Sequence, residues 1–174
     1  MAPNADTPEE APAGAESDAP PITINAQYIK DLSFEAPASP GIFGTMRNAA
    51  PDINVNIDVN AVPIADSSAF EVVLDITANC TVEETSAFIL ELSYAGLFSL
   101  NVPEEHLQAI LLIECPRLLF PFARNVLADV SRDGGFPPLM LGPVDFVSMY
   151  QSQLQQATEA EGGESDEAEG EGDS

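Results

Sequence analysis

Residues Phe70–Phe98 read FEVVLDITANCTVEETSAFILELSYAGLF, and this stretch decides the fold. It contains two runs, Phe70–Cys80 and Ser86–Phe98, in which apolar or aromatic side chains recur at nearly every second position. Because successive side chains of a strand point to opposite faces, each run predicts a strand with one covered face and one wetter face. The connection between the runs is short enough for a hairpin. The stretch therefore predicts two neighbouring antiparallel strands.

Two earlier runs, Ile22–Glu35 and Asp52–Asn60, alternate in the same way. In the first run, one face is expected to carry Ile22, Ile24, Ala26, Tyr28, Leu32 and Phe34, with Lys30 as the exception. The opposite face is expected to carry Thr23, Asn25, Gln27, Asp31, Ser33 and Glu35. Period-two patterning on four consecutive segments is typical of an antiparallel sheet. The connection Pro37–Pro51 is longer than a tight turn and rich in apolar residues, which makes it a candidate binding loop.

The pattern becomes helical after Pro103. A first helix is expected to end at a break at Pro116, and a second to continue to Val130 and end at Gly134 and Gly135. A last helix is expected to carry the apolar stripe Phe146, Val147, Tyr150 and Leu154. Strands followed by helices predict an α+β domain, a four-stranded antiparallel sheet with helices packed on one face. The long helical region is apolar around more of its surface than one sheet can cover, which predicts contact with another copy of the chain.

The composition separates a folded domain from two tails. Residues 1–21 and 157–174 are acidic and without periodicity, so we expect both to be disordered and residues 22–156 to fold. The formal net charge is -24, from 29 acidic and 5 basic residues. This charge disfavours nucleic acid and anionic membranes as partners and favours basic proteins. No run of about twenty apolar residues and no signal-peptide pattern occurs, so we expect a cytoplasmic protein that does not insert into membranes.

The residues of common catalytic and metal sites are missing. The one histidine, His106, follows two glutamates at a helix start without a metal-protease spacing. Cys80 and Cys115 have no CxxC or Cys/His spacing, and their apolar surroundings predict two buried, reduced thiols. We therefore expect neither an enzyme nor a protein with a cofactor or metal ion.

Carboxylates gather on one predicted face of the sheet. By parity this face carries no lysine or arginine, and its acidic residues are Asp31, Glu35, Asp52, Asp58, Glu71, Asp75 and Glu91. Like charges on neighbouring strands repel, and an ordinary solvated face mixes both signs. The pattern has two interpretations: general acidity of the chain, or a docking surface for a basic partner with Val73, Ile89 and Leu97 as apolar contacts.

Several strings of this sequence resemble the SecB family of bacterial export chaperones across residues 22–156. They are YIKDLSFEAP, FEVVLDITA, EETSAFILELSYAGLFSL and CPRLLFPFARNVLADVSRDGGFPPLMLGPVDF. The resemblance implies a cytosolic, ATP-independent holdase that binds unfolded secretory precursors, keeps them competent for translocation and delivers them to the SecA motor ATPase. It also implies a homotetramer, built as a dimer of dimers.

The resemblance assigns roles to individual positions. Its SecA-binding residues match Asp31, Glu35, Ile89 and Glu91. The positions that it uses for assembly match Leu90, Leu92 and Tyr94. Its client groove, the groove that holds unfolded precursors, is expected to involve Phe34, Ile42, Phe43, Met46, Phe136, Leu139 and Leu141.

A second class of function stays open at this point. An acidic module that mimics nucleic acid would block a basic DNA-binding protein, and it would need carboxylates spaced like phosphates over an extended surface. It would need no apolar groove. The capture of an unfolded precursor separates the two functions.

Overall fold

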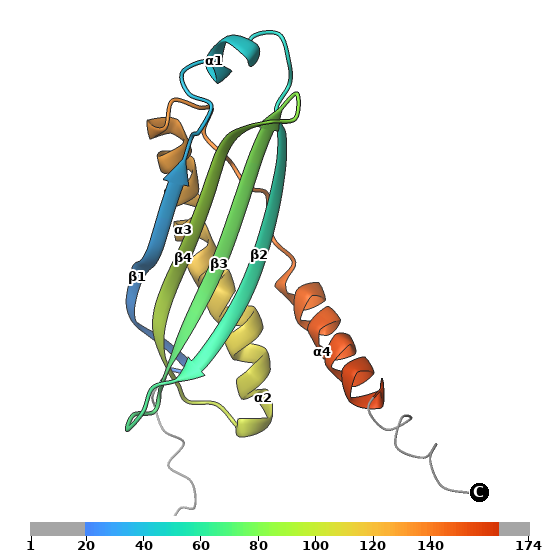
Figure 1. Ribbon diagram of the computed structural model, residues 1–174. Helices are drawn as coiled ribbons and strands as arrows, with labels where there is room; N and C mark the ends of the chain where they lie inside the picture. The colour runs from blue at the N-terminus through green and yellow to red at the C-terminus, as the bar shows by residue number, and fades with distance from the viewer. Residues whose placement is uncertain (1–19, 164–174) are drawn as a thin grey trace, which may run out of the picture.

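Four long strands form one antiparallel sheet in the computed structural model, which describes residues 20–163 (Figure 1). The spatial order is β1 (Ile22–Glu35), β4 (Thr85–Leu100), β3 (Ala69–Val82) and β2 (Asp52–Pro63). The helices α2 and α3 lie against one face, and the other face, toward the viewer in Figure 1, is left uncovered. The predicted α+β class, with helices on one face of a four-stranded sheet, is confirmed.

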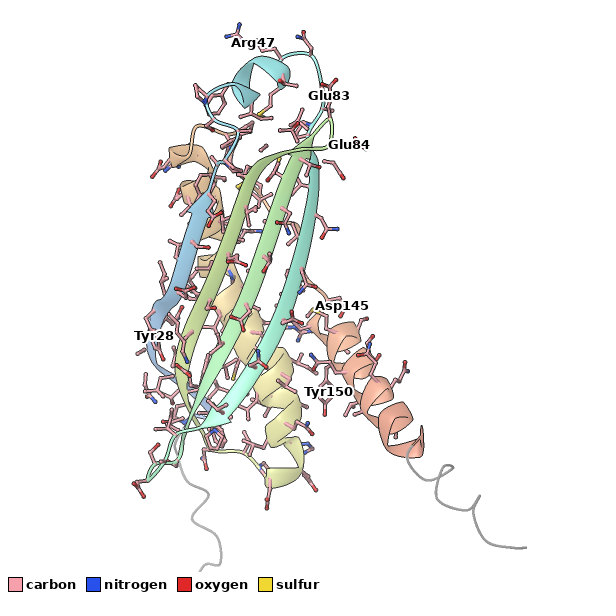
Figure 2. All side chains as sticks on the ribbon, viewed as in Figure 1. Tyr28, Arg47, Glu83, Glu84, Asp145 and Tyr150 are labelled. Atoms are coloured by element: carbon pink, nitrogen blue, oxygen red, sulfur yellow. The ribbon has the colours of Figure 1, made fainter. Side chains whose placement is uncertain are left out.

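The β3–β4 hairpin turns at two glutamates. Val82 pairs with Thr85, and Glu83 and Glu84 between them have φ angles of +48° and +66° (Figure 2). Positive φ at both central residues is the geometry of a type I′ turn, whose twist matches that of the flanking strands. The hairpin predicted from the alternating runs is therefore present.

The helical region is continuous through α2 (Glu104–Ala109), η1 (Ile110–Glu114) and α3 (Cys115–Asp133), so the predicted break at Pro116 is wrong. The η1 segment is a π-helical turn that ends at Glu114, two residues before Pro116. Proline has no N–H to donate, and its ring clashes with the carbonyl four residues earlier in a regular helix, so a wider turn accommodates it. The helix ends as predicted, at Gly134 and at Gly135 with φ +89°.

The core lies between α3 and the helix-facing side of β3 and β4. Gly96 allows the close approach of α3, because a Cβ at this position would lie 2.7 Å from Cδ2 of Leu119. Buried side chains from both layers form the core, among them Val72, Leu74, Ile76, Leu90, Leu92, Phe98, Leu119 and Leu127. A well-packed layer of this kind holds the sheet and α3 in a fixed relation.

Two further helices flank the sheet. The short α1 (Ile42–Thr45) lies within the predicted binding loop. The helix α4 (Phe146–Gly163) packs beside η1, and the Phe146 ring lies 6.0 Å from that of Phe120. It continues past Gln156, where the folded domain was expected to end. Of the expected tails, residues 1–19 and 164–174 lie outside the described residues. No helix between residues 20 and 163 is long and apolar enough to cross a membrane.

The predicted parity of β1 is wrong in its middle. Two irregularities in its pairing with β4 lie between Ile24 and Ala26 and between Ile29 and Asp31. Each β-bulge adds one residue to the strand, which reverses the faces of all residues up to the next bulge. Ala26 and Tyr28 therefore lie on the uncovered face, and Gln27 and Ile29 lie on the helix side. After the second bulge, Leu32 and Phe34 return to the helix side as predicted.

Candidate binding surfaces

The uncovered face of the sheet carries the predicted carboxylates. The pairing of β1 with β4 sets Glu35 opposite Ile89 and Ser33 opposite Glu91, and Asp31 lies opposite Ser93. The four residues for which the family resemblance implies SecA contact thus form one continuous patch across two neighbouring strands. Asp31 and Glu35 lie about 13 Å apart along β1 at roughly 3.3 Å per residue. That spacing is too wide for one metal ion and suits an extended basic segment.

Neighbouring side chains relieve the repulsion among these carboxylates. Asp58 and Asp75 lie directly opposite each other on β2 and β3. Asn56 donates a hydrogen bond to Asp58 (2.6 Å), and Ser93 and Asn60 both donate to Asp75. On the β1 side, the Ser33 hydroxyl donates to Glu91 (3.1 Å). Each of these donors is an uncharged hydroxyl or amide, so none of them forms an ion pair with a carboxylate.

The expectation that this face holds no basic residue is wrong. The bulge turns Lys30 onto the acidic side, where its Nζ lies 2.7 Å from Oε2 of Glu71. The Tyr28 hydroxyl donates to the other oxygen, Oε1, at 2.5 Å. The bonds from Lys30 and Tyr28 hold the pKa of the Glu71 carboxyl below its usual range, and the same contact raises the pKa of Tyr28. The positive charge of Lys30 therefore offsets the negative charge of the Glu71 carboxylate.

An apolar hollow of about 270 Å³ opens at the end of the molecule that carries α1. It lies where α1, the starts of β2 and β4 and the segment after α3 meet. Its walls are Met46, Pro51, Ile53, Cys80, Phe88, Phe136, Pro137, Pro138, Leu139 and Met140. The walls are almost entirely apolar and include two methionines, side chains that adapt to irregular partners. Such a surface can hold apolar segments of differing sequence.

Phenylalanine rings form one wall of the hollow and the layer behind it. Phe136 lies at the centre, with ring centroids 5.0 Å from Phe88, 5.2 Å from Phe43 and 6.1 Å from Phe34. Aromatic pairs at these separations add stabilisation beyond the area that they bury. The rings give the adaptable methionines a rigid base.

The predicted groove residues divide into three groups. Met46, Phe136 and Leu139 line the hollow, while Phe34 and Phe43 pack behind it. Ile42 is buried and Leu141 packs against the core, so neither forms its wall. Sequence reasoning missed Pro51, Ile53, Cys80, Phe88, Pro137, Pro138 and Met140. The FPPLM string at residues 136–140 was an available signal for Pro137, Pro138 and Met140, since prolines beside Leu and Met in a loop favour an open apolar surface.

Two polar contacts fix the 136–141 segment to α3. The buried Ser131 hydroxyl accepts the Leu139 N–H (2.8 Å) and donates to the Leu127 carbonyl (2.8 Å). Further along, the Arg124 guanidinium donates to the Leu141 carbonyl at 3.4 Å. One wall of the hollow is therefore held by α3 through hydrogen bonds as well as packing.

The three residues matched to assembly, Leu90, Leu92 and Tyr94, are buried on the helix side of β4. Their side chains belong to the core of this chain and present little surface to another copy. Other apolar side chains of β1 and α3 do reach the surface, among them Ile24, Ile29, Leu32, Leu118 and Phe122.

The remaining candidate groups are two cysteines and one histidine. Cys80 and Cys115 are buried free thiols, as the sequence predicted, and burial raises the pKa of Cys115 to about 12. His106 is exposed beside Glu105, with 3.5 Å between Nε2 and Oε1. Within residues 20–163, no group of three or more His, Cys, Asp or Glu side chains could hold a metal ion.

Comparison with known proteins decides the family. A model of the family described as "Preprotein translocase subunit SecB" matches residues 15–157. The chain belongs to the SecB family. The protein-export protein SecB of Paramagnetospirillum magneticum is 47% identical over 91% of this chain and 97% of its own length. The protein-export protein SecB of Maricaulis maris is 52% identical over 92% of this chain and 93% of its own length.

The fold has a solved counterpart. A SecB-like chaperone of Mycobacterium tuberculosis, Rv1957, was solved in complex with a ChAD peptide from the Rv1956 HigA1 antitoxin. It matches with a TM-score of 0.56 and 20% identity, over 71% of this chain and 91% of that one. This likeness shows a shared fold. Together with the family it supports a chaperone role in protein export.

Proposed function

We propose that the protein is an ATP-independent holdase of the cytoplasm. It binds unfolded secretory precursors, keeps them translocation-competent and delivers them to the SecA motor ATPase without catalysis or a cofactor. The observation that carries this proposal is the presence of two unlike surfaces on one rigid subunit, an apolar hollow and an acidic sheet face.

The hollow supports the client-binding half of the proposal. A holdase must accept many sequences, which requires apolar, adaptable contacts rather than placed polar groups. Met46 and Met140 supply adaptable contacts, and the packed Phe88 and Phe136 rings, 5.0 Å apart, support them from behind. An extended segment with one or two large apolar side chains fits a hollow of about 270 Å³.

The acidic face supports the delivery half. Asp31, Glu35 and Glu91 with Ile89 offer three carboxylates around one apolar side chain on a flat surface. This arrangement is complementary to a short basic segment, and electrostatic complementarity contributes mainly to the association rate and to specificity. Since the patch and the hollow lie on different parts of the subunit, a bound client leaves the patch open to SecA.

The exposed apolar residues support assembly into a homotetramer, a dimer of dimers. β1 is an edge strand of the sheet, and unpaired edges are templates for pairing with another chain. Leu118 and Phe122 on α3 form a second apolar surface, on the side of the helix away from the sheet. Two different surfaces of this kind provide the two interfaces that such an assembly needs.

The test is suppression of aggregation. A reduced, unfolded precursor is diluted into buffer without nucleotide, and its light scattering is followed with increasing amounts of the protein. The proposal predicts loss of scattering near one binding equivalent. Undiminished scattering, combined with tight binding to a basic DNA-binding enzyme, would instead support the mimic of nucleic acid.

A further inference from the structure

We propose that Lys30 is a specificity-determining residue of the acidic face. Its positive charge excludes the basic partner from the Glu71 end of the face and confines docking to Asp31, Glu35, Asp75 and Glu91. The inference rests on the proposed function, because it concerns the surface to which SecA is proposed to bind. Lys30 adds a repulsive group to a face whose other charged groups are carboxylates.

The bulge in β1 is the structural origin of this role. In a regular strand, Lys30 and Asp31 would point to opposite sides of the sheet. The pairing passes from Ile29 opposite Tyr94 directly to Asp31 opposite Ser93, so Lys30 is the extra residue. Its bond to Glu71 places it on the same face as Asp31. One inserted residue thus brings a positive charge next to the carboxylates of the docking patch.

Glu71 is closed to a partner by two neighbours. The Lys30 ammonium binds Oε2 at 2.7 Å and the Tyr28 hydroxyl binds Oε1 at 2.5 Å, which engages both oxygens of the carboxylate. The Glu71 side chain is 13% exposed, while that of Lys30 is 48% exposed. A partner's cation approaching Glu71 therefore meets an exposed positive charge before it reaches the shielded carboxylate.

The surface beside this ion pair has opposite character at its two ends. A shallow hollow of about 340 Å³ is lined by Lys30, Asp31, Asn60, Val62, Glu71, Val73, Asp75 and Ser93. At one end Lys30 forms an ion pair with Glu71, and at the other no basic side chain of residues 20–163 forms an ion pair with Asp31 or Asp75. Tyr28, which marks the neutralised end, lies on β1 well away from the β3–β4 turn at Glu83 and Glu84 (Figure 2).

The partner is therefore directed along β1 and β4 toward Glu35. A basic segment placed in this direction meets Asp31, Glu91 and Glu35 in succession. Placed in the other direction, it meets Lys30. Specific interfaces commonly combine attraction for the correct arrangement with repulsion of the alternatives.

The test is SecA binding by Lys30→Gln at low ionic strength. Removing the charge opens Glu71 and should tighten binding roughly two- to fivefold, as expected for a partly exposed charge at an interface. The double variant Lys30→Gln with Glu71→Gln should bind SecA with wild-type affinity. It lacks both the repulsive Lys30 ammonium and the Glu71 carboxylate that the single variant exposes. Arg132→Gln is the matched control, since Arg132 is an ion-paired base on the helix side, 2.8 Å from Asp129. It should leave the affinity unchanged.

The outcomes separate this inference from the proposed function. Unchanged or weaker binding by Lys30→Gln, or equal tightening by Arg132→Gln, overturns the role of Lys30. If Asp31→Asn with Glu91→Gln loses binding in the same titration, the docking face itself stands. If the wild-type protein does not bind SecA, both proposals are overturned.

Discussion

Met140 is the most exposed large apolar side chain of the hollow, with 64% of its area open. We expect Met140→Ser to weaken client binding without weakening the fold. Full burial of a methionine side chain contributes about 1.5–3 kcal/mol. If a client covers the exposed two thirds of the Met140 side chain, its binding to Met140→Ser is weaker by about 1–2 kcal/mol. This corresponds to a decrease in affinity of roughly five- to thirtyfold.

The assay is equilibrium binding of a fluorescently labelled, reduced precursor, with unfolding in urea as the measure of stability. Ile64→Ser is the matched control, because Ile64 is an exposed apolar residue outside the hollow. Both variants should unfold within about 0.5 kcal/mol of the wild type, as surface substitutions usually do. Equal client affinity for Met140→Ser and the wild type, or an equal loss in Ile64→Ser, would refute the assignment of the hollow.

Three further predictions address the other parts of the molecule. Asp31→Asn with Glu91→Gln should weaken SecA binding more at low than at high salt and leave client capture intact; a salt-independent loss measured by titration would contradict docking through charge. Ser131→Ala leaves the buried Leu139 N–H without its acceptor and should cost about 1–3 kcal/mol of unfolding free energy, so an unshifted urea midpoint would show that the contact is unimportant. Lys30 and Tyr28 lower the pKa of Glu71 in the folded state, so the contribution of Glu71 to stability is present above the ordinary glutamate pKa and is lost as the pH falls through the lowered pKa. In unfolding experiments from neutral to acid pH, Glu71→Gln should therefore lose less stability on acidification than the wild type. An identical pH dependence of the two proteins would contradict the contact.

The long strands could be predicted because their alternation extends over many residues. In Phe70–Cys80 one wrong residue does not change the period, and the short connection to the run that begins at Ser86 favours a hairpin. The helix ends at Gly134 and Gly135 could also be read, since glycine tolerates the positive φ that ends a helix.

The faces of β1 could not be read from the same pattern. The extra residues at Asn25 and Lys30 are set by how β1 pairs with β4, and the alternation of β1 alone does not identify them as bulges. The alternation marked Lys30 as an exception on the predicted apolar face, but it did not indicate that Lys30 lies on the acidic face. The π-helical turn at η1 was hidden for a similar reason, because Pro116 alone indicates a break as readily as a widened turn.

The two candidate surfaces differ in how far the sequence could define them. Strand parity predicted the face of the acidic patch correctly, because the two bulges of β1 cancel before Asp31, and the pairing of β1 with β4 brings the four predicted residues together. The hollow is assembled from segments far apart in the chain, so Ile53, Phe88 and Met140 could not be linked without the fold. Periodicity also cannot separate a residue that lines a surface from one buried behind it, as Ile42 shows.

Amide hydrogen exchange with and without a bound unfolded precursor tests the central claim most directly, that client and SecA use different surfaces of one subunit. The account predicts slower exchange in residues 46–53 and 136–141 when the precursor binds, and unchanged exchange at Asp31, Ile89 and Glu91. It further predicts that SecA slows exchange at the second set and not at the first. Precursor-dependent protection of the acidic face, with none at the hollow, would contradict it.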